Sequence, residues 1–282
     1  MVRIGLIGTE SSHARAFAEI IGRSPRRATV TAVLEEGDGA GEQLAEQYGI
    51  PHVLRELEEM PQTVDAVMIL YRDGARHEPA ARQMLEAGVS VWLDKPFTPQ
   101  VAQAKALYRL ARQQRLTLDG GSTVRFSPDV QAFAKQVRRR RELLGGSFNY
   151  MGMADSPHSG LFFYGPHAMT LLAEMFGPRV RSMLALREAH SLIALARYER
   201  YLVCVHMEDC GQSQATLYTP EGIVQSPLGF EDIYARALQH FLDLLNAGGL
   251  APLEKLLAPV ALLDALQRSL LSGREEPVDS WD

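Results

Sequence analysis

Apolar residues in the first 121 positions gather in short runs, and the segments between these runs have helical periodicity. The runs are apolar on both alternating faces, which predicts buried strands at Val2–Ile7, Ala28–Leu34, Asp65–Leu70, Val89–Leu93 and Leu116–Leu118. Strands that are apolar on both faces and separated by single helices are typical of a parallel sheet with helices on both sides. We therefore predict an α/β domain over residues 1–121, built on a doubly wound parallel sheet.

Beyond residue 121 the hydrophobic pattern changes. Ser127-Pro128 precedes a segment with helical periodicity. Strand-like runs then recur without a helix between most of them, at Ser147–Met151, Val180–Arg187, Leu192–Arg197, Tyr201–Met207 and around Ala215–Tyr218. The last predicted elements are helices over about Asp232–Asn246 and Leu253–Leu271. This pattern predicts a second, α+β domain over residues 122–282, with an open, mostly antiparallel sheet.

Composition and charge narrow the class of protein. A chain of 282 residues is long enough for two domains. Its formal net charge of −5 provides no general attraction to nucleic acid or to an anionic membrane. Its two cysteines imply no disulfide framework, no apolar stretch approaches a membrane span, and Met1-Val2-Arg3 leads directly into a strand pattern rather than a signal peptide. We therefore expect a cytoplasmic protein that binds neither nucleic acid nor a membrane.

The turn after the first predicted strand carries part of a Rossmann fingerprint. Such a turn has glycines at three positions, for the turn itself, for the approach of a pyrophosphate, and for helix packing. The stretch here is Gly8-Thr9-Glu10-Ser11-Ser12-His13, so Glu10 and His13 replace the second and third glycines. One interpretation is an ordinary turn in which Ser11 or Ser12 caps the next helix. The other is a cofactor site, because the small hydroxyls in this stretch can donate to phosphate oxygens at a helix N-terminus.

The end of the second predicted strand bears on the identity of the cofactor. Glu35 stands where a Rossmann-like domain places an acid that accepts hydrogen bonds from a ribose 2′-hydroxyl. The same carboxylate would repel a 2′-phosphate, so the sequence favours NAD over NADP. Glu36 follows directly and offers the same chemistry, which leaves the choice between the two residues open.

A lysine follows the fourth predicted strand of the first domain. Asp94-Lys95-Pro96 comes directly after Val89–Leu93. Because ligands of open α/β sheets bind outside the carboxyl ends of the strands, Lys95 is placed to hydrogen-bond a reacting hydroxyl or carbonyl. The alternative is a solvated lysine in a loop.

Taken together, these residues resemble the Gfo/Idh/MocA family, named after glucose-fructose oxidoreductase and inositol dehydrogenase. The resemblance rests on the segments Asp65–Leu70, His77–Ala80, Leu85–Gly88, Asp94–Pro96 and Arg125-Phe126. It covers the first domain and extends into the second. Members usually have Glu-Lys-Pro at the strand end, so Asp94 is a departure from the pattern.

The resemblance implies a fold and a cofactor site. Members bind NAD(P) in the first domain and place a sugar or cyclitol between it and the open sheet. By this resemblance, further cofactor-binding residues are His77, Asp94, Lys95, Pro96 and Arg125. Gly8 and the polar residues of its turn complete the expected cofactor site.

The resemblance also points to a second site motif. Members have an aspartate, a glycine two residues later and a histidine two residues after that; here Gly165 and His167 match, but Phe163 stands at the aspartate position. By resemblance, His167 would exchange the substrate proton and Lys95 would orient the substrate hydroxyl; imidazole has a pKa near neutrality, which suits this role. The alternative is that His167 packs and caps a helix. Tyr164 is a further catalytic candidate through its phenol hydroxyl, with packing as its alternative role.

Some polar residues of the second domain are of metal-ligand type. Asp155, His158 and His167 have suitable side chains, but their spacing matches no metal motif. We therefore expect no metal site.

These observations lead to the hypothesis of an NAD-dependent oxidoreductase that transfers hydride between nicotinamide and a small polyhydroxylated substrate. One alternative is an enzyme that retains NAD and hides the redox step within an elimination, epimerisation or glycoside cleavage. Another is a non-catalytic binding or regulatory protein on the same fold. An open sheet must cover one face, so we expect a homodimer or homotetramer that associates through the second domain.

Overall fold

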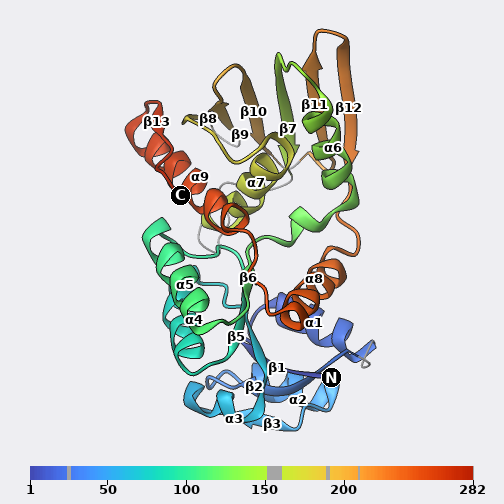
Figure 1. Cartoon of the computed structure of the whole chain (residues 1–282), viewed down its shortest axis with the longest axis vertical. Coiled ribbons are helices and arrows are strands. Elements are labelled where there is room, and N and C mark those ends of the chain that lie inside the picture. Colours follow the sequence, from blue (N-terminus) through green and yellow to red (C-terminus); the bar gives the residue numbers. More distant parts are fainter. Residues whose placement is uncertain (24–26, 151–160, 189–190, 209, 282) are drawn as a thin grey trace. The chain divides into compact units, whose positions relative to one another are not determined.

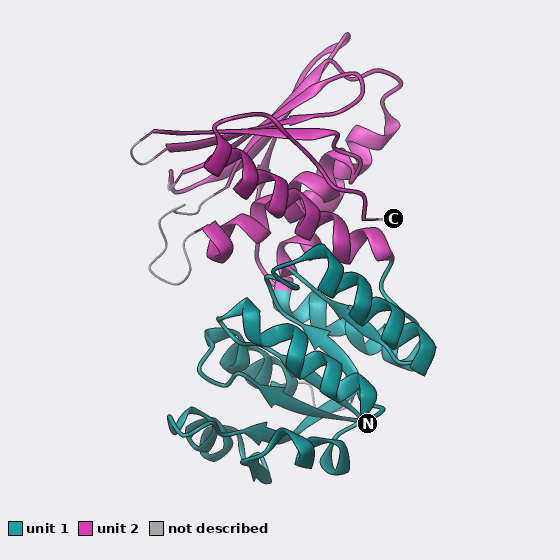
Figure 2. Ribbon diagram, turned by 90° about the vertical axis from the view of Figure 1, so that its left-hand side faces the viewer, with its two compact units in different colours: residues 1–121, 234–252 teal, residues 122–233, 253–282 magenta. Residues whose placement is uncertain are grey.

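The computed structural model describes residues 1–23, 27–150, 161–188, 191–208 and 210–281. The chain divides into two compact units (Figure 2). Unit 1 comprises Met1–Gly121 and Tyr234–Pro252, and unit 2 comprises Ser122–Ile233 and Leu253–Asp282.

Unit 1 is built on a six-stranded parallel sheet with the order β3-β2-β1-β4-β5-β6. This is the strand order of a Rossmann fold, so the predicted doubly wound sheet is confirmed. The strands are β1 (Val2–Ile7), β2 (Ala28–Leu34), β3 (His52–Leu54), β4 (Ala66–Ile69), β5 (Ser90–Leu93) and β6 (Leu118–Gly120). Every residue of β4 and β5 is buried, which explains their continuous apolar runs.

Helices cover both faces of this sheet, with α4 and α5 on one side and α1 and α8 on the other (Figure 1). Their bounds are α1 (Ser12–Arg23), α2 (Ala40–Tyr48), α3 (Met60–Thr63), α4 (His77–Glu86), α5 (Val101–Gln114) and α8 (Ile233–Ala247), with short 3₁₀ turns η1 (Leu57–Glu59) and η2 (Gly74–Arg76). In α1 the buried side chains are those with helical spacing: Ala14, Phe17, Ala18 and Ile21.

Helix α8 requires a correction to the predicted domains. We expected one continuous second domain over residues 122–282, but Tyr234–Pro252 belongs to unit 1. The physical reason is an aromatic contact surface. Tyr234 meets Phe17 edge to face with ring centroids 5.5 Å apart, and Phe241 meets Trp92 at 5.7 Å.

Unit 2 is built on a seven-stranded sheet with the order β12-β11-β7-β10-β9-β8-β13. The pair β7–β10 is parallel and the other neighbours are antiparallel, which confirms the mostly antiparallel sheet. Its strands are β7 (Gly145–Tyr150), β8 (Ser182–Glu188), β9 (Ser191–Arg197), β10 (Leu202–Met207), β11 (Ser213–Thr219), β12 (Gly222–Leu228) and β13 (Glu276–Pro277).

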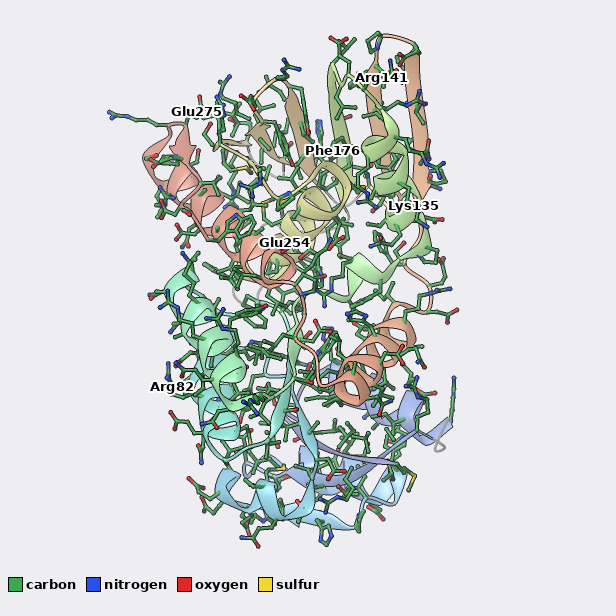
Figure 3. All side chains as sticks on the ribbon, in the orientation of Figure 1. Arg82, Lys135, Arg141, Phe176, Glu254 and Glu275 are labelled. Atoms are coloured by element: carbon green, nitrogen blue, oxygen red, sulfur yellow. The ribbon has the colours of Figure 1, made fainter. Side chains whose placement is uncertain are left out.

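Helices of unit 2 pack against one face of this sheet. They are α6 (Pro128–Arg139), α7 (Leu161–Phe176) and α9 (Leu253–Ser272), preceded by the 3₁₀ turn η3 (Thr123–Phe126). The labelled Phe176 lies beside the sheet (Figure 3), and its ring stacks on Phe148 of β7 with centroids 6.5 Å apart. Alternate residues of β9 are buried and partly exposed, so one face of the sheet remains partly open within the chain.

Candidate active site

The turn between β1 and α1 is held together by its own polar groups. Gly8 has φ +80°, and a Cβ there would lie 2.4 Å from the backbone nitrogen of Tyr71, so this position requires glycine. The Thr9 hydroxyl donates to the carbonyl of Leu34 at 3.2 Å. Ser11 accepts from the amide of His13 through its side chain. The turn thus has the N-capping geometry of the first interpretation, while Ser12 is exposed at the helix start.

Glu10 stands at the second glycine position of a standard Rossmann fingerprint. The Glu10 carboxylate accepts from the backbone N–H of Arg72 at 3.2 Å. It therefore faces the segment that follows β4, at the carboxyl edge of the sheet.

Glu35 follows β2 as predicted, but its carboxylate is engaged by the protein backbone. Its side chain is buried, and its carboxylate accepts from the backbone N–H groups of Gly37, Gly39, Gly41 and Glu42. Burial alone would raise the pKa of Glu35, but these four N–H groups outweigh it and hold the pKa below its ordinary value. Both carboxylate oxygens are therefore engaged at the start of α2, and neither is left for a ribose.

Glu36 is the carboxylate that remains available at this strand end. It accepts from the Tyr71 hydroxyl at 3.1 Å and pairs with the Arg76 guanidinium. That guanidinium also lies over the Tyr71 ring, 3.8 Å from its centroid. The ends of β2 and β4 thus share one polar cluster, in which Glu36 is partly exposed.

The segment after β5 brings Asp94 against the first turn of α1. The Nδ1 atom of His13 donates to Oδ2 of Asp94 at 2.6 Å. Asp94 is only 2% exposed, and its Oδ1 atom has no hydrogen-bond partner among the described residues. Burial alone would raise the pKa of Asp94, but His13, and then Lys95 and His77, hold it below its ordinary value. Asp94 is therefore a buried, ionised carboxylate.

Lys95 is a buried side chain and not a solvated one. It is 5% exposed, which contradicts the alternative of a lysine in an exposed loop. Burial lowers the pKa of its ammonium group, and the Asp94 carboxylate opposes this shift. The following Pro96 is fixed by close packing, because a Cβ on Gly74 would lie 2.3 Å from its Cγ.

His77 contacts the Pro96 segment from within unit 1, and none of its side chain is exposed. It is fully buried, with Nδ1 2.7 Å from the carbonyl oxygen of Pro96 and Nε2 2.9 Å from that of Tyr71. Burial lowers the pKa of His77, so the neutral ring donates to one of these carbonyls. His77 therefore supports the Pro96 segment in this structure, and its expected role at the cofactor site stays a prediction.

His167 lies within α7 of unit 2, and not at its N-terminus. Its Nδ1 atom is 2.6 Å from the hydroxyl oxygen of Ser122, and its ring is 5.6 Å from that of Tyr150. Tyr164 is partly buried and packs its ring edge to face on Phe163 at 4.8 Å. The structure thus gives His167 a polar partner that the sequence analysis missed.

Arg125 also belongs to unit 2. It lies in η3, is 4% exposed, and places its guanidinium carbon 4.6 Å from the ring centroid of Phe126. Its carbonyl accepts from the Gln131 side chain.

Asp155 and His158 lie outside the described residues. Within the part of the chain that the structure describes, no group of three or more His, Cys, Asp or Glu side chains is arranged to hold a metal ion. Over the same residues, no helix is both long and apolar enough to cross a membrane.

Comparison with known proteins identifies relatives of this chain. Residues 2–121 match the model of an oxidoreductase family, GFO_IDH_MocA, described as an NAD-binding Rossmann fold. An uncharacterized oxidoreductase of Escherichia coli (strain K12), YhhX, is 29% identical over 48% of this chain. The match spans 43% of that relative, so the chain covers less than half of its length.

Solved structures share the fold of the whole chain. GenD2 from gentamicin A biosynthesis, in complex with NAD, superposes with a TM-score of 0.84 at 19% identity and covers 99% of this chain and 97% of its own. The scyllo-inositol dehydrogenase of Lactobacillus casei, with bound NAD(H) and scyllo-inositol, has a TM-score of 0.82 at 15% identity, covering 99% and 100%. Residues 2–121 are thus similar to an NAD-binding family of oxidoreductases, and the chain has the two-unit fold of these solved structures.

Proposed function

We propose that this protein is an NAD-dependent dehydrogenase that transfers hydride between nicotinamide and a hydroxyl-bearing carbon of a small sugar or cyclitol. The observation that carries the proposal is the buried Lys95 at the carboxyl end of β5, next to the ionised Asp94. In open α/β folds, ligands bind outside the carboxyl ends of the strands, so a lysine at this position can hydrogen-bond a reacting substrate hydroxyl.

The residues of unit 1 fit a nicotinamide dinucleotide. The Oδ1 atom of Asp94 is a buried acceptor without a partner among the described residues, and a cofactor hydroxyl or amide would satisfy it. Glu36, at the end of β2, can accept hydrogen bonds from a ribose, and its charge disfavours a 2′-phosphate. Ser12, at the start of α1, leaves its hydroxyl exposed for a phosphate. We therefore assign the ribose role to Glu36 in place of Glu35 and retain NAD over NADP.

When bound, NAD carries the hydride; the protein orients the substrate and moves its proton. In this proposal Lys95 holds the reacting oxygen, and its lowered pKa makes it a better donor to an oxygen that gains negative charge. His167 exchanges the hydroxyl proton at Nε2. The Ser122 hydroxyl can either donate to Nδ1 or accept from it, so it stabilises both tautomers that this exchange requires.

The substrate class rests on the family and on residue types, with one departure. Phe163 replaces the carboxylate that members place near the histidine, so this chain lacks one acceptor for a substrate hydroxyl. Tyr164 remains a candidate to provide a hydroxyl in its place. A substrate with fewer polar contacts on this side fits that change.

Titration of the purified protein with NADH tests the cofactor, because the buried Trp92 of β5 provides a fluorescence signal within unit 1. We expect saturable quenching with NADH and weaker binding of NADPH. No binding of either at millimolar concentration would reject the proposal. Turnover is then measured on a panel of sugars and cyclitols.

The same panel separates the alternatives. Cofactor that stays bound through purification, with product formed but no net NADH, would favour hidden redox chemistry. Sugar binding without any turnover would favour a non-catalytic member of the family.

We also propose a homodimer or homotetramer that associates through the open sheet face of unit 2. Apolar side chains of β8 and β9 pair across that face, Leu184 with Leu195 and Leu186 with Ile193, and Leu186 is 55% exposed. Light scattering on the wild type and on Leu186→Glu tests this proposal. A wild type that is monomeric at micromolar concentration would overturn it.

A further inference from the structure

Two departures from the expected sequence pattern meet in space. His13 stands where the Rossmann fingerprint has its third glycine, and Asp94 stands where members of the family usually have glutamate. The two residues are 81 positions apart in the sequence, yet the His13 Nδ1 atom donates to Asp94 Oδ2 at 2.6 Å. Both residues belong to unit 1.

The surroundings make Asp94 dependent on His13. Among the described residues, His13 is the hydrogen-bond donor to Oδ2, and Oδ1 has no donor. The His13 side chain is 16% exposed, and its ring packs edge to face on Tyr234 of α8 at 5.1 Å. Burial and the Asp94 charge together raise the pKa of Tyr234 to about 12, so this neighbour stays neutral. His13 is thus fixed in place by α8 and presents its N–H to the carboxylate.

Size explains why the two departures belong together. With glycine at position 13, the shorter aspartate would keep its buried charge and lose its donor. With glutamate at position 94, the extra methylene would enter the space that the His13 ring fills. Either change alone leaves an unpaired charge or an overpacked contact, whereas both together recreate the glycine and glutamate of the usual pattern.

We propose that His13 is a positioning residue, and that His13 and Asp94 form a compensating pair that replaces the usual glycine and glutamate. The pair holds the carboxylate ionised beside Lys95, and through the adjoining peptide it fixes the start of the Lys95-Pro96 segment. The consequence for catalysis rests on the proposed function of Lys95. The pairing itself is a property of the protein without cofactor and can be tested in its absence.

The test is a double-mutant cycle on the full chain, with His13→Gly, Asp94→Glu and the double variant. Thermal unfolding is measured without cofactor, and NADH affinity is measured separately. We expect each single variant to lower Tm by about 10 °C, because removing one partner of a buried pair is strongly destabilising and a unit of this size responds by several degrees. The double variant should recover more than half of the loss.

Further variants keep the test decisive if His13→Gly fails to fold. His13→Asn retains an N–H donor close to the Nδ1 position and should keep most of the wild-type Tm. His13→Leu fills the space without a donor and should not. As a matched control, His52→Gly on exposed β3 is combined with Asp94→Glu and should give no recovery.

Additive effects of His13→Gly and Asp94→Glu on Tm would overturn the proposal, as would equal Tm values for His13→Asn and His13→Leu. A second readout is the split of the kinetic constants. If His13 positions Lys95, His13→Leu should lower kcat more than it raises KM, about tenfold against less than threefold. Wild-type protein that binds no NADH would reject the proposed function and leave the Tm cycle interpretable.

Discussion

The two units differ in how they hold their candidate chemical groups. In unit 1, Lys95 lies next to the buried Asp94 carboxylate, which is hydrogen-bonded to His13. The following Pro96 is contacted by the buried His77. In unit 2, His167 has a serine hydroxyl as its polar partner, and Phe163 replaces the expected aspartate nearby. Unit 1 thus holds Lys95 among buried charged groups, whereas unit 2 places His167 on a mostly apolar helix, beside a neutral hydroxyl.

This difference suggests a division of roles. A group that contacts the cofactor and the reacting oxygen meets the same chemistry for any substrate, so a rigid charged site suits it. We propose that substrate discrimination comes from unit 2, where Phe163 stands in place of a carboxylate that could accept from a substrate hydroxyl. Variants in unit 1 should therefore affect turnover on every substrate, and variants in unit 2 should change the ranking of substrates.

The largest effect is expected for Lys95→Ala. In the proposed function the Lys95 ammonium donates to the reacting oxygen, so its loss should lower kcat/KM about 10³-fold on all substrates of the panel. NADH titration should still show binding, because the other expected cofactor-binding residues are unchanged. Lys135→Ala, on the exposed surface of α6 (Figure 3), is the control and should leave kcat/KM unchanged. Near-wild-type turnover of Lys95→Ala would remove this residue from the mechanism.

The corresponding variants of unit 2 should have smaller effects. His167→Gln keeps the approximate size of the side chain but cannot exchange a proton, and should lower kcat about 100-fold.

Ser122→Ala removes the partner of the His167 Nδ1 atom and should lower kcat about tenfold, with a shift of the pH profile of kcat. If Ser122→Ala changed only KM, the serine would contact substrate and would not tune the histidine.

The pattern of apolar residues predicted most of unit 1 because its sheet is buried on both faces. The bounds of β1 and β2 agree with the prediction. The partner of α8 could not be predicted in this way. Periodicity identifies a helix but does not say which sheet it packs on, and Phe241 and Tyr234 find their partners only in the folded chain.

Unit 2 was harder to predict, for reasons that are visible in its elements. Strand β12 is mostly exposed and contains Pro227, so it lacks the alternation of a half-buried strand. Helix α7 contains Gly165-Pro166 and is apolar on almost every side, so it has neither uninterrupted helix formers nor an amphipathic pattern. Ser122 follows a glycine pair, and only the fold shows that it reaches His167.

Glu35 and Glu36 show the limit of reasoning from motif spacing alone. Both follow β2, and spacing does not decide which of them turns inward. The glycines at positions 37, 39 and 41 were the available indication, because a glycine-rich segment exposes backbone N–H groups that a carboxylate can cap.

A third prediction concerns cofactor choice at this strand end. Glu36→Gln removes the charge that disfavours a 2′-phosphate and leaves Arg76 without its partner, so the preference for NADH over NADPH should fall about tenfold. The measurement is the ratio of the two dissociation constants by fluorescence titration. Glu86→Gln, exposed at the end of α4, is the control and should leave the ratio unchanged. A ratio that changes with Glu35→Gln but not with Glu36→Gln would restore the original assignment.

The smallest expected effect is on stability and separates the buried acid of unit 1 from an exposed acid of unit 2. The folded-state pKa of Glu35 is lowered, so the stability that it contributes is fully present above its unfolded pKa and is lost as pH falls through the folded value. Glu35→Gln should therefore reduce the free energy of unfolding by about 1 kcal/mol at neutral pH, and the difference from wild type should shrink below about pH 4.5. Urea unfolding between pH 3 and 7 measures this difference in free energy.

In unit 2, Arg197 and Ser182 lower the pKa of Glu275 to about 2, but this carboxylate is 40% exposed and solvent screens its ion pair. Glu275→Gln, at the position labelled in Figure 3, should consequently change stability less than Glu35→Gln at every pH. An equal loss of unfolding free energy in both variants would contradict this prediction. It would mean that water hydrates the backbone N–H groups around Glu35 as well as it hydrates the exposed ion pair of Glu275.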